Sequence, residues 1–233
     1  TGRSYASLPQ HIKDVTGIEY AITSNGAHVN RLQSGEQIYS DFLDPDAVER
    51  VAELKSETGA EIEVFIDGRA YVDESYYEDV RVNGCEYRNA DYVLWSRRPV
   101  PDVTALMLEH KNEIENINLV YPEYDLLTEA KPKVCAIQNA TITSSFINNL
   151  EVGGPDTSKK TALLWLTDRL GIKTDELMSC GDAPNDMAML ELAGIGVAVA
   201  NAWGGLKDHA DYVTASNDDD GVALAIEKFV LKR

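Results

Sequence analysis

The chain has 233 residues, of which 44% are hydrophobic, and it carries a formal net charge of −18 at pH 7. This length allows one large domain or two modest ones, and the hydrophobic content is enough for a packed core, which excludes disorder as the default state. The strong negative charge repels nucleic acid and anionic membrane surfaces, so neither is expected as a partner. The charge is compatible with a divalent cation as a partner, and solubility alone also accounts for it.

The first part of the chain predicts a helix followed by a strand. Residues 5–15 have a helical pattern, and residues 19–23 have the pattern of a strand that ends at Ser24-Asn25-Gly26. We expect this segment to belong to an α/β domain, in which the chain opens at the end of one strand and supplies a helix and the next strand.

The middle of the chain has a different pattern. We expect hairpin-like stretches at 38–42 and 62–69, helices around 47–56 and 103–112, and a further strand at 141–147. This is an α+β pattern that interrupts an α/β pattern. It predicts an inserted α+β domain over residues 28–150, while residues 1–27 and 151–233 together form the first domain.

The last third of the chain alternates helix and strand. The expected helices are 157–170, 187–192, 206–210 and 222–231, and the expected strands are 176–180, 195–200 and 212–214. The run at 195–200 consists of small apolar residues throughout, as is typical of a strand buried on both faces. The alternation predicts a parallel sheet in a doubly wound, Rossmann-like α/β core.

Two carboxylates follow the strand expected at 176–180. Asp182 and Asp186 stand four residues apart in Gly181-Asp182-Ala183-Pro184-Asn185-Asp186, at the edge where open α/β sheets bind ligands. Two carboxylates in one pocket repel unless a cation lies beside them, and Mg²⁺ prefers such oxygen ligands. The spacing is equally compatible with a plain structural arrangement, in which Asp186 caps a helix and Asp182 turns the chain.

Two further segments have the chemistry of an anion site. Ser158-Lys159-Lys160-Thr161 stands at an expected helix start, where free N–H groups and a lysine suit a phosphate. Adjacent lysines are also common on a solvated helix face. Thr1-Gly2-Arg3 offers a hydroxyl, an amide and a guanidinium in succession.

The order of these motifs resembles the haloacid-dehalogenase-like (HAD) hydrolase superfamily, and within it the Cof-type phosphatases. The resemblance covers T-G-R at 1–3, N-G-A at 25–27, a long insertion, S-K-x-T-A-L at 158–163 and G-D-x-x-N-D-x-x-M-L at 181–190. It continues through the A-G-I-G-V-A-V, N-A and D-G-V-A segments that follow 190. The insertion matches in position and general pattern only.

The resemblance implies a role for each matching residue. Thr1 and the Gly2 amide correspond to the groups that bind the transferring phosphoryl, and Lys159 to the lysine that neutralises its charge. Asp182 corresponds to the Mg²⁺ ligand, Asn185 to a phosphate-side amide and Asp186 to a carboxylate that orients Lys159 or metal-bound water. Three residues near the pocket are implied as possible substrate contacts: Arg3, Asn25 and Asn201.

The chain departs from the family in two places. The family's first motif, D-x-D-G-T, whose first aspartate attacks phosphorus, occurs nowhere in the sequence. We expect the strand that carries this motif to lie upstream of residue 1. A non-catalytic relative and a permuted register are the two alternatives. The second departure is Lys160, which stands where the family usually has glycine.

The implied function is a Mg²⁺-dependent phosphatase that hydrolyses a small phosphomonoester, a sugar phosphate or nucleotide-like compound, through an aspartyl-phosphate. The alternatives are a hexose-phosphate phosphomutase and a non-catalytic binder of phosphorylated metabolites. The expected partner is a small phosphorylated metabolite, and the expected state is a monomer or homodimer.

Cysteine usage and hydropathy bear on location. The three cysteines are Cys85, Cys135 and Cys180, with no CxxC pair, and no apolar run is long enough for a membrane helix. We expect a reducing, cytoplasmic location.

Overall fold

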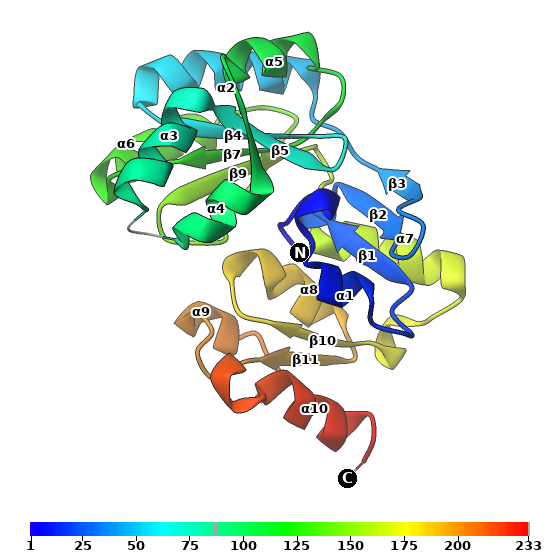
Figure 1. Ribbon diagram of the computed structural model, residues 1–233. Helices are drawn as coiled ribbons and strands as arrows, with labels where there is room; N and C mark the ends of the chain where they lie inside the picture. Colours follow the sequence, from blue (N-terminus) through cyan, green and yellow to red (C-terminus); the bar gives the residue numbers. More distant parts are fainter. Residues whose placement is uncertain (86–87, 233) are drawn as a thin grey trace. The chain divides into compact units, whose positions relative to one another are not determined.

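The computed structural model describes residues 1–85 and 88–232 (Figure 1). The chain divides into two compact units, Thr1–Ser158 and Lys159–Arg233. The first unit holds the segment expected to open the core as well as the segment expected as the inserted domain. The domain boundaries at 27/28 and 150/151 stay a prediction.

The first unit opens with short elements: η1 (Tyr5–Ser7), α1 (Gln10–Lys13), β1 (Tyr20–Thr23), η2 (Ser24–Gly26), β2 (His28–Arg31) and β3 (Gln37–Ser40). The helix predicted over 5–15 is wrong in its continuity. Pro9 separates η1 from α1, because proline lacks the N–H and its ring clashes with the preceding helical turn.

The strand predicted at 19–23 is confirmed as β1, but its pairing differs from the expectation of a parallel sheet. It pairs antiparallel with β2, and β2 pairs antiparallel with β3, in the order β1-β2-β3. The short turn η2 returns the chain directly, and a direct return gives antiparallel neighbours.

The rest of the first unit is a six-stranded sheet with helices. Its elements are α2 (Pro45–Thr58), β4 (Glu61–Ile66), β5 (Arg69–Asp73), α3 (Glu74–Asn83), α4 (Ala90–Ser96), β6 (Arg97–Val100), α5 (Val103–Glu109), β7 (Ile114–Val120), α6 (Tyr124–Val134), β8 (Thr141–Thr143) and β9 (Asn149–Gly153). The strand order is β6-β5-β4-β7-β9-β8. Neighbours are antiparallel except β5 and β6, which are joined through α3 and α4.

The main core of this unit lies between one face of the six-stranded sheet and the helices α2, α5 and α6 (Figure 1). Alternate strand residues point into it, such as Ile62 and Val64 on β4 and Ile117 and Leu119 on β7. The opposite face carries a smaller cluster under α3 and α4, built from Val72, Tyr76, Val80 and Val93.

A buried ion cluster occupies this second face. The Glu63 carboxylate, which has no exposed surface, accepts hydrogen bonds from Arg97 Nη2 at 2.7 Å and Asn118 Nδ2 at 2.8 Å, and it also pairs with Arg88. Burial alone would raise the pKa of Glu63, but the two guanidinium groups outweigh it and hold the pKa well below its ordinary range. Removing any one partner would therefore destabilise the folded protein, because it would leave a buried charge uncompensated.

The strand β2 begins with a buried histidine. His28 is 1% exposed, and its Nδ1 lies 3.6 Å from Glu115 Oε2. Burial lowers its pKa to about 4, against a weaker opposing effect from Asp67. The folded chain therefore keeps this imidazole neutral where an unfolded chain would protonate it.

We expect acid to destabilise the protein through His28. Below pH 6.5 His28 is protonated in the unfolded chain, whereas in the folded chain it stays neutral down to about pH 4. The free energy of unfolding is therefore unaffected by His28 above pH 6.5 and decreases as the pH falls below this value. The loss amounts to about 3 kcal/mol across this window, at about 1.4 kcal/mol per pKa unit. Urea unfolding at pH 7, 6 and 5 measures it. The plot of unfolding free energy against pH should be flatter in His28→Leu. It should keep the parental slope in the control His11→Leu, since His11 is exposed. Equal slopes in the two variants would contradict the assignment to His28.

The second unit alternates helix and strand as predicted. Its elements are α7 (Lys159–Leu170), η3 (Thr174–Glu176), β10 (Met178–Gly181), η4 (Pro184–Asp186), α8 (Met187–Leu192), β11 (Ile195–Ala198), α9 (Gly204–Lys207), β12 (Tyr212–Val213), η5 (Asn217–Asp219) and α10 (Gly221–Phe229). The sheet order is β10-β11-β12 and both pairings are parallel, which confirms the predicted parallel arrangement.

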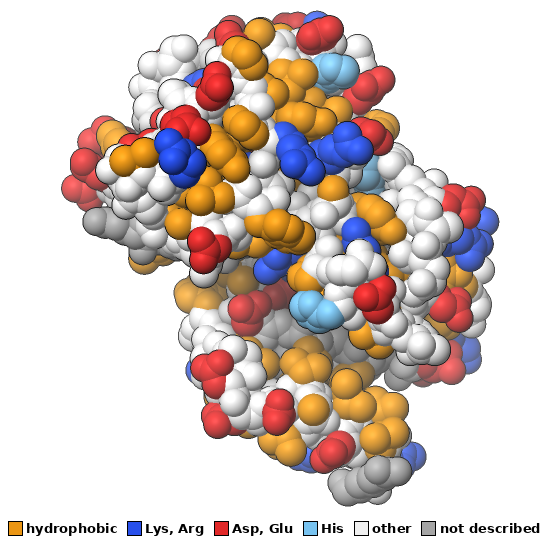
Figure 2. All heavy atoms as spheres, in the orientation of Figure 1, with side chains coloured by type: hydrophobic (Ala, Val, Ile, Leu, Met, Phe, Trp, Pro, Cys, Tyr) orange, Lys and Arg blue, Asp and Glu red, His pale blue; other side chains and the backbone are white. Residues whose placement is uncertain are grey.

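The C-terminal helix carries an apolar surface. Figure 2 shows hydrophobic side chains gathered over α10, and the exposed ones include Val222, Leu224 and Ile226. The second unit does not bury these side chains in its own core, which is formed around Leu190, Ala198 and Leu206.

Within the described residues, the helices are too short or too polar to cross a lipid bilayer.

Candidate active site

The two predicted carboxylates lie at the carboxyl end of β10, in the second unit. β10 ends at Gly181, Asp182 follows it, and Asp186 ends the short turn η4. The Asp182 side chain is exposed and that of Asp186 is buried. The backbone N–H groups of Asp182 and Ala183 both donate to Asp186 Oδ2, at 3.0 and 3.3 Å. The turn therefore folds around one carboxylate and presents the other to solvent.

Gly181 is required by this packing. A Cβ added there would lie 2.5 Å from Asp186 Cβ, closer than side-chain atoms approach. Any larger residue at 181 would push Asp186 out of its place.

Lys159 meets the buried carboxylate. It is the first residue of α7, and its Nζ donates to Asp186 Oδ1 at 2.6 Å, with 11% and 7% of the two side chains exposed. The neighbouring Lys160 is exposed to solvent. The structure thus brings together Lys159 and Asp186, the pair that the sequence motifs suggested.

The charges at this end of β10 are unequal. Burial alone would raise the pKa of Asp186, but the Lys159 ammonium and the two backbone N–H groups hold it below its ordinary value. The pKa of Asp182 is raised, first by desolvation and then by repulsion from Asp186, against a lowering effect of Lys159. Asp182 is therefore the carboxylate that would gain from an added cation.

The two asparagines of the second unit have different surroundings. Asn185 lies in η4, half-buried, between the two carboxylates in sequence. Asn201 follows β11, and its Oδ1 accepts a hydrogen bond from the Asn217 backbone N–H at 3.0 Å. That bond joins the loop after β11 to the turn before α10. The Asn201 side chain therefore stabilises the connection between these two segments.

The other predicted residues lie in the first unit and form one backbone arrangement. Ser24 N donates to Arg3 O at 2.9 Å, Asn25 N to Thr1 O at 3.0 Å, and the Thr1 nitrogen to Ile22 O at 3.0 Å. The T-G-R segment is therefore held against the end of β1 and the turn after it.

Side chains of this arrangement reach the six-stranded sheet. The Asn25 amide donates to Glu151 Oε2 at 2.7 Å, and the Arg3 guanidinium lies 4.3 Å from the ring centre of Tyr92 on α4. Sequence reasoning identified Asn25 and Arg3 but missed Glu151. No sequence signal points to it, because Asn149–Gly153 alternates polar and apolar residues as a strand with one solvent-facing side does.

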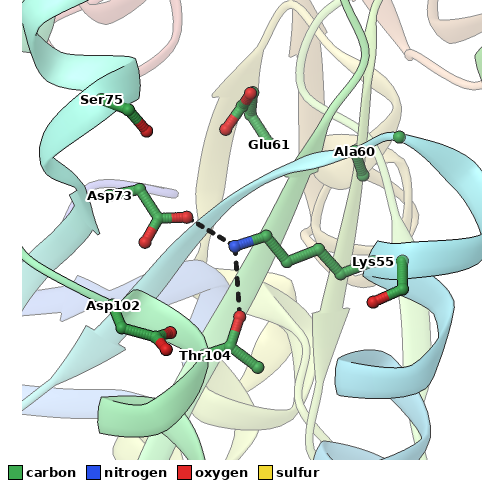
Figure 3. Close-up of a pocket in the computed structure, with 9 residues that line it drawn as sticks. Lys55, Ala60, Glu61, Asp73, Ser75, Asp102 and Thr104 are labelled. Carbon is green, nitrogen blue, oxygen red and sulfur yellow. Dashed lines mark hydrogen bonds and ion pairs between the residues drawn. The ribbon is translucent and has the colours of Figure 1, made fainter.

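A separate pocket lies elsewhere in the first unit, lined among others by Lys55, Glu61, Asp73, Asp102 and Thr104 (Figure 3). The Lys55 ammonium lies between the Asp73 carboxylate and the Thr104 hydroxyl and bonds to both. Asp73 also accepts from the Val103 N–H, and Asp102 from the Ala105 N–H. Most of its charged groups are occupied by one another and by helix ends, and it includes none of the predicted site residues.

Comparison with known proteins decides the family. The model of the haloacid dehalogenase-like hydrolases matches residues 1–226. The chain belongs to this family. The resemblance seen in the sequence motifs is thereby confirmed.

Relatives within the family are named as phosphatases. The 5-amino-6-(5-phospho-D-ribitylamino)uracil phosphatase YcsE of Bacillus subtilis (strain 168) is 39% identical over 107 residues, which are 46% of this chain and 43% of that protein. The HMP-PP phosphatase of Cronobacter sakazakii (strain ATCC BAA-894) is 30% identical over 87% of this chain and 70% of that protein. The chain thus spans less than half the length of the first relative.

Solved structures confirm the fold class. A HAD subclass IIB sugar phosphatase, BT4131, matches with a TM-score of 0.81 and 25% identity, over 98% of this chain and 83% of that one. A haloacid dehalogenase-like hydrolase from B. subtilis matches with a TM-score of 0.80 and 25% identity, over 99% and 86% of the two chains. The family's fold, a Rossmann-like core with a cap, therefore extends over nearly the whole chain.

Proposed function

We propose that the whole protein is a Mg²⁺-dependent phosphatase that hydrolyses a small phosphomonoester through an aspartyl-phosphate. The observation that carries the proposal is the Lys159–Asp186 pair, joined at 2.6 Å beside the exposed Asp182 at the carboxyl end of β10. An exposed carboxylate beside a fixed ammonium can hold a cation and a phosphate together, which is what phosphoryl transfer requires.

The donor set fits Mg²⁺. Among residues 1–85 and 88–232, His, Cys, Asp and Glu side chains form no cluster of three or more with metal-binding geometry. Mg²⁺ does not need one, because it keeps several waters and is commonly bound through one or two carboxylates. Asp182 would hold the ion, since its raised pKa reflects desolvation and repulsion that Lys159 offsets only in part. When bound, Mg²⁺ would offset the negative charge that develops on the phosphoryl oxygens.

The chain's own residues would fix the phosphate. Asp186 would hold the Lys159 ammonium in place, and that ammonium would neutralise phosphoryl charge without having to reorganise during transfer. Following the family resemblance, the Asn185 amide would donate to the phosphoryl oxygens, and the Thr1 hydroxyl and the Gly2 amide correspond to phosphate-binding groups. The family's attacking aspartate has no counterpart among these residues, so activity is to be measured on the full-length protein.

The substrate class follows from the relatives. Those named above act on a phosphoribityl compound, on HMP-PP and on a sugar phosphate, which are all small phosphorylated metabolites. We place the substrate of this protein in the same class. Residues 28–150 would form the cap that excludes water and selects the leaving group.

The test is a substrate panel. Full-length protein is incubated with Mg²⁺ and a set of sugar phosphates, phosphorylated sugar alcohols and nucleotides, and both free phosphate and isomerised sugar phosphate are measured. We expect release of free phosphate from at least one compound at a kcat/KM of about 10⁴ M⁻¹s⁻¹ or more. Isomerisation without release would indicate a mutase, and no reaction with any compound would contradict the proposal.

A further inference from the structure

The turn between β1 and β2 has an unusual backbone. Ser24, Asn25 and Gly26 have φ angles of 48°, 58° and 106°, three consecutive residues in the left-handed region. All three are buried, and the first two carry side chains. A non-glycine residue in this region costs about 1–3 kcal/mol and persists only where its surroundings fix it, which points to a functional constraint.

Glu151 is one of the groups that fix the turn. Its carboxylate, in a residue only 5% exposed on β9, accepts the Asn25 amide at 2.7 Å and the Ser145 hydroxyl at 2.9 Å. Asn25 is itself only 4% exposed. A hydrogen bond in so dry a place has little competition from water, so the orientation of the Asn25 side chain is firmly set.

Glu115 on β7 supports the same turn from a second strand. It accepts the Ser24 hydroxyl at 2.7 Å and the Gly68 N–H. Burial raises the pKa of Glu115. The two carboxylates therefore hold adjacent residues of the turn from neighbouring strands of the six-stranded sheet, since β7 pairs with β9.

The turn also fixes the position of the T-G-R segment, residues 1–3. The backbones of Ser24 and Asn25 donate to Arg3 and Thr1, as described above. The Asn25 Oδ1 also lies 3.0 Å from the position that a Cβ on Gly2 would occupy. The Asn25 side chain thus packs directly on Gly2, and a rotation of that side chain would displace the segment that carries the Thr1 hydroxyl and the Gly2 amide.

We propose that Glu151 is a positioning residue for the phosphate-binding segment Thr1–Gly2 and acts through the side chain of Asn25. This inference rests on the proposed function, which assigns Thr1 and Gly2 to the phosphate. It adds a residue of the six-stranded sheet that does not itself touch phosphate but determines how well the segment binds it.

The test reverses the polarity of the Asn25–Glu151 hydrogen bond. In Asn25→Asp, two buried carboxylates face each other, the turn is forced apart, and orthophosphate binding to full-length protein with Mg²⁺ should weaken by about tenfold or more. Glu151→Gln alone should weaken it by less than about threefold, because the glutamine oxygen can still accept from Asn25 while its amide donates to Ser145 Oγ. The double variant should return to within about threefold of the parent, since the introduced glutamine amide then donates to the introduced aspartate.

Glu63→Gln is the matched control. Glu63 lies buried on the same face of the sheet as Glu151, and both residues pair with Asn118, from the two strands on either side of β7. The Glu63 carboxylate accepts hydrogen bonds from Arg88, Arg97 and Asn118. It should lower the melting temperature and leave orthophosphate affinity within about twofold of the parent, since only stability depends on it.

Calorimetric titration with inorganic phosphate gives the affinities, and thermal unfolding gives the melting temperatures. The proposal is overturned if Asn25→Asp binds phosphate like the parent, if the double variant binds no better than Asn25→Asp, or if Glu63→Gln weakens binding as much. Failure of the proposed function shows in the parent protein alone, as a lack of ester hydrolysis, whereas failure of this inference shows only between variants.

Discussion

Replacing Lys159 by methionine should lower kcat/KM of the full-length protein for its phosphomonoester by about 10²–10³-fold, the usual cost of losing one preorganised charge-stabilising group. Methionine keeps much of the side-chain length and apolar packing and removes the ammonium. The Asp186 carboxylate then loses its 2.6 Å partner. The pKa of Asp186 should rise, because burial raises it and the Lys159 ammonium that lowers it is gone.

The matched control is Lys160→Met. Lys160 is the next residue along α7 and is exposed, so its loss removes the same charge from the same helix start without touching Asp186. We expect its kcat/KM to stay within about threefold of the parent, as for most exposed charges. Steady-state kinetics on both variants make the comparison. An equal loss in the two would mean that the helix start as a whole, and not Lys159, provides the charge.

Replacing Asp182 by asparagine should lower Mg²⁺-dependent turnover by at least about a hundredfold, since a metal ion supplies several kcal/mol of charge stabilisation and a tenfold rate change corresponds to about 1.4 kcal/mol. Asparagine keeps the shape of the side chain but is a neutral and weaker ligand for Mg²⁺. The concentration of Mg²⁺ needed for half-maximal activity should rise as well. Asp208→Asn removes an exposed carboxylate from the second unit near α9 and should leave both quantities unchanged.

The arrangement of the candidate residues in the second unit could be predicted because they are local in sequence. Gly181, Asp182 and Asp186 lie within six residues of one another. A helix that packs on a parallel sheet starts or ends at the strand ends, and ligands bind at the carboxyl ends of the strands. The helix from Lys159 to Leu170 was predicted from its start signal at 157–158, and the strand β11 from a continuous apolar run; both signals depend on near neighbours only.

The first unit shows where such reasoning fails. Residues 5–15 have a helical pattern, but Pro9 breaks it, and this local signal outweighs the apolar periodicity around it. The antiparallel pairing of β1 was harder to foresee, because it depends on three residues in the left-handed region, two of which are not glycine.

The buried carboxylates were beyond the sequence for a different reason. Whether Glu63, Glu115 and Glu151 point into the protein depends on the register of β4, β7 and β9, which pairs residues far apart in the chain. A one-residue shift would turn each of them to the opposite face of the sheet. Their partners, such as Arg97 for Glu63 and Asn25 for Glu151, are set by tertiary packing alone.

The central claim is that the carboxyl end of β10 holds Mg²⁺ and phosphate together, with Asp182 as the metal ligand and Lys159 as the phosphate-side charge. The most direct measurement is phosphate release from a phosphomonoester by the full-length protein, in Mg²⁺ and then in excess EDTA, for the parent and for Asp182→Asn. The parent should lose its activity in EDTA and regain it when Mg²⁺ is restored, and Asp182→Asn should stay at least about a hundredfold below the parent in saturating Mg²⁺. Undiminished phosphate release in EDTA, or parental activity in Asp182→Asn, would contradict the claim.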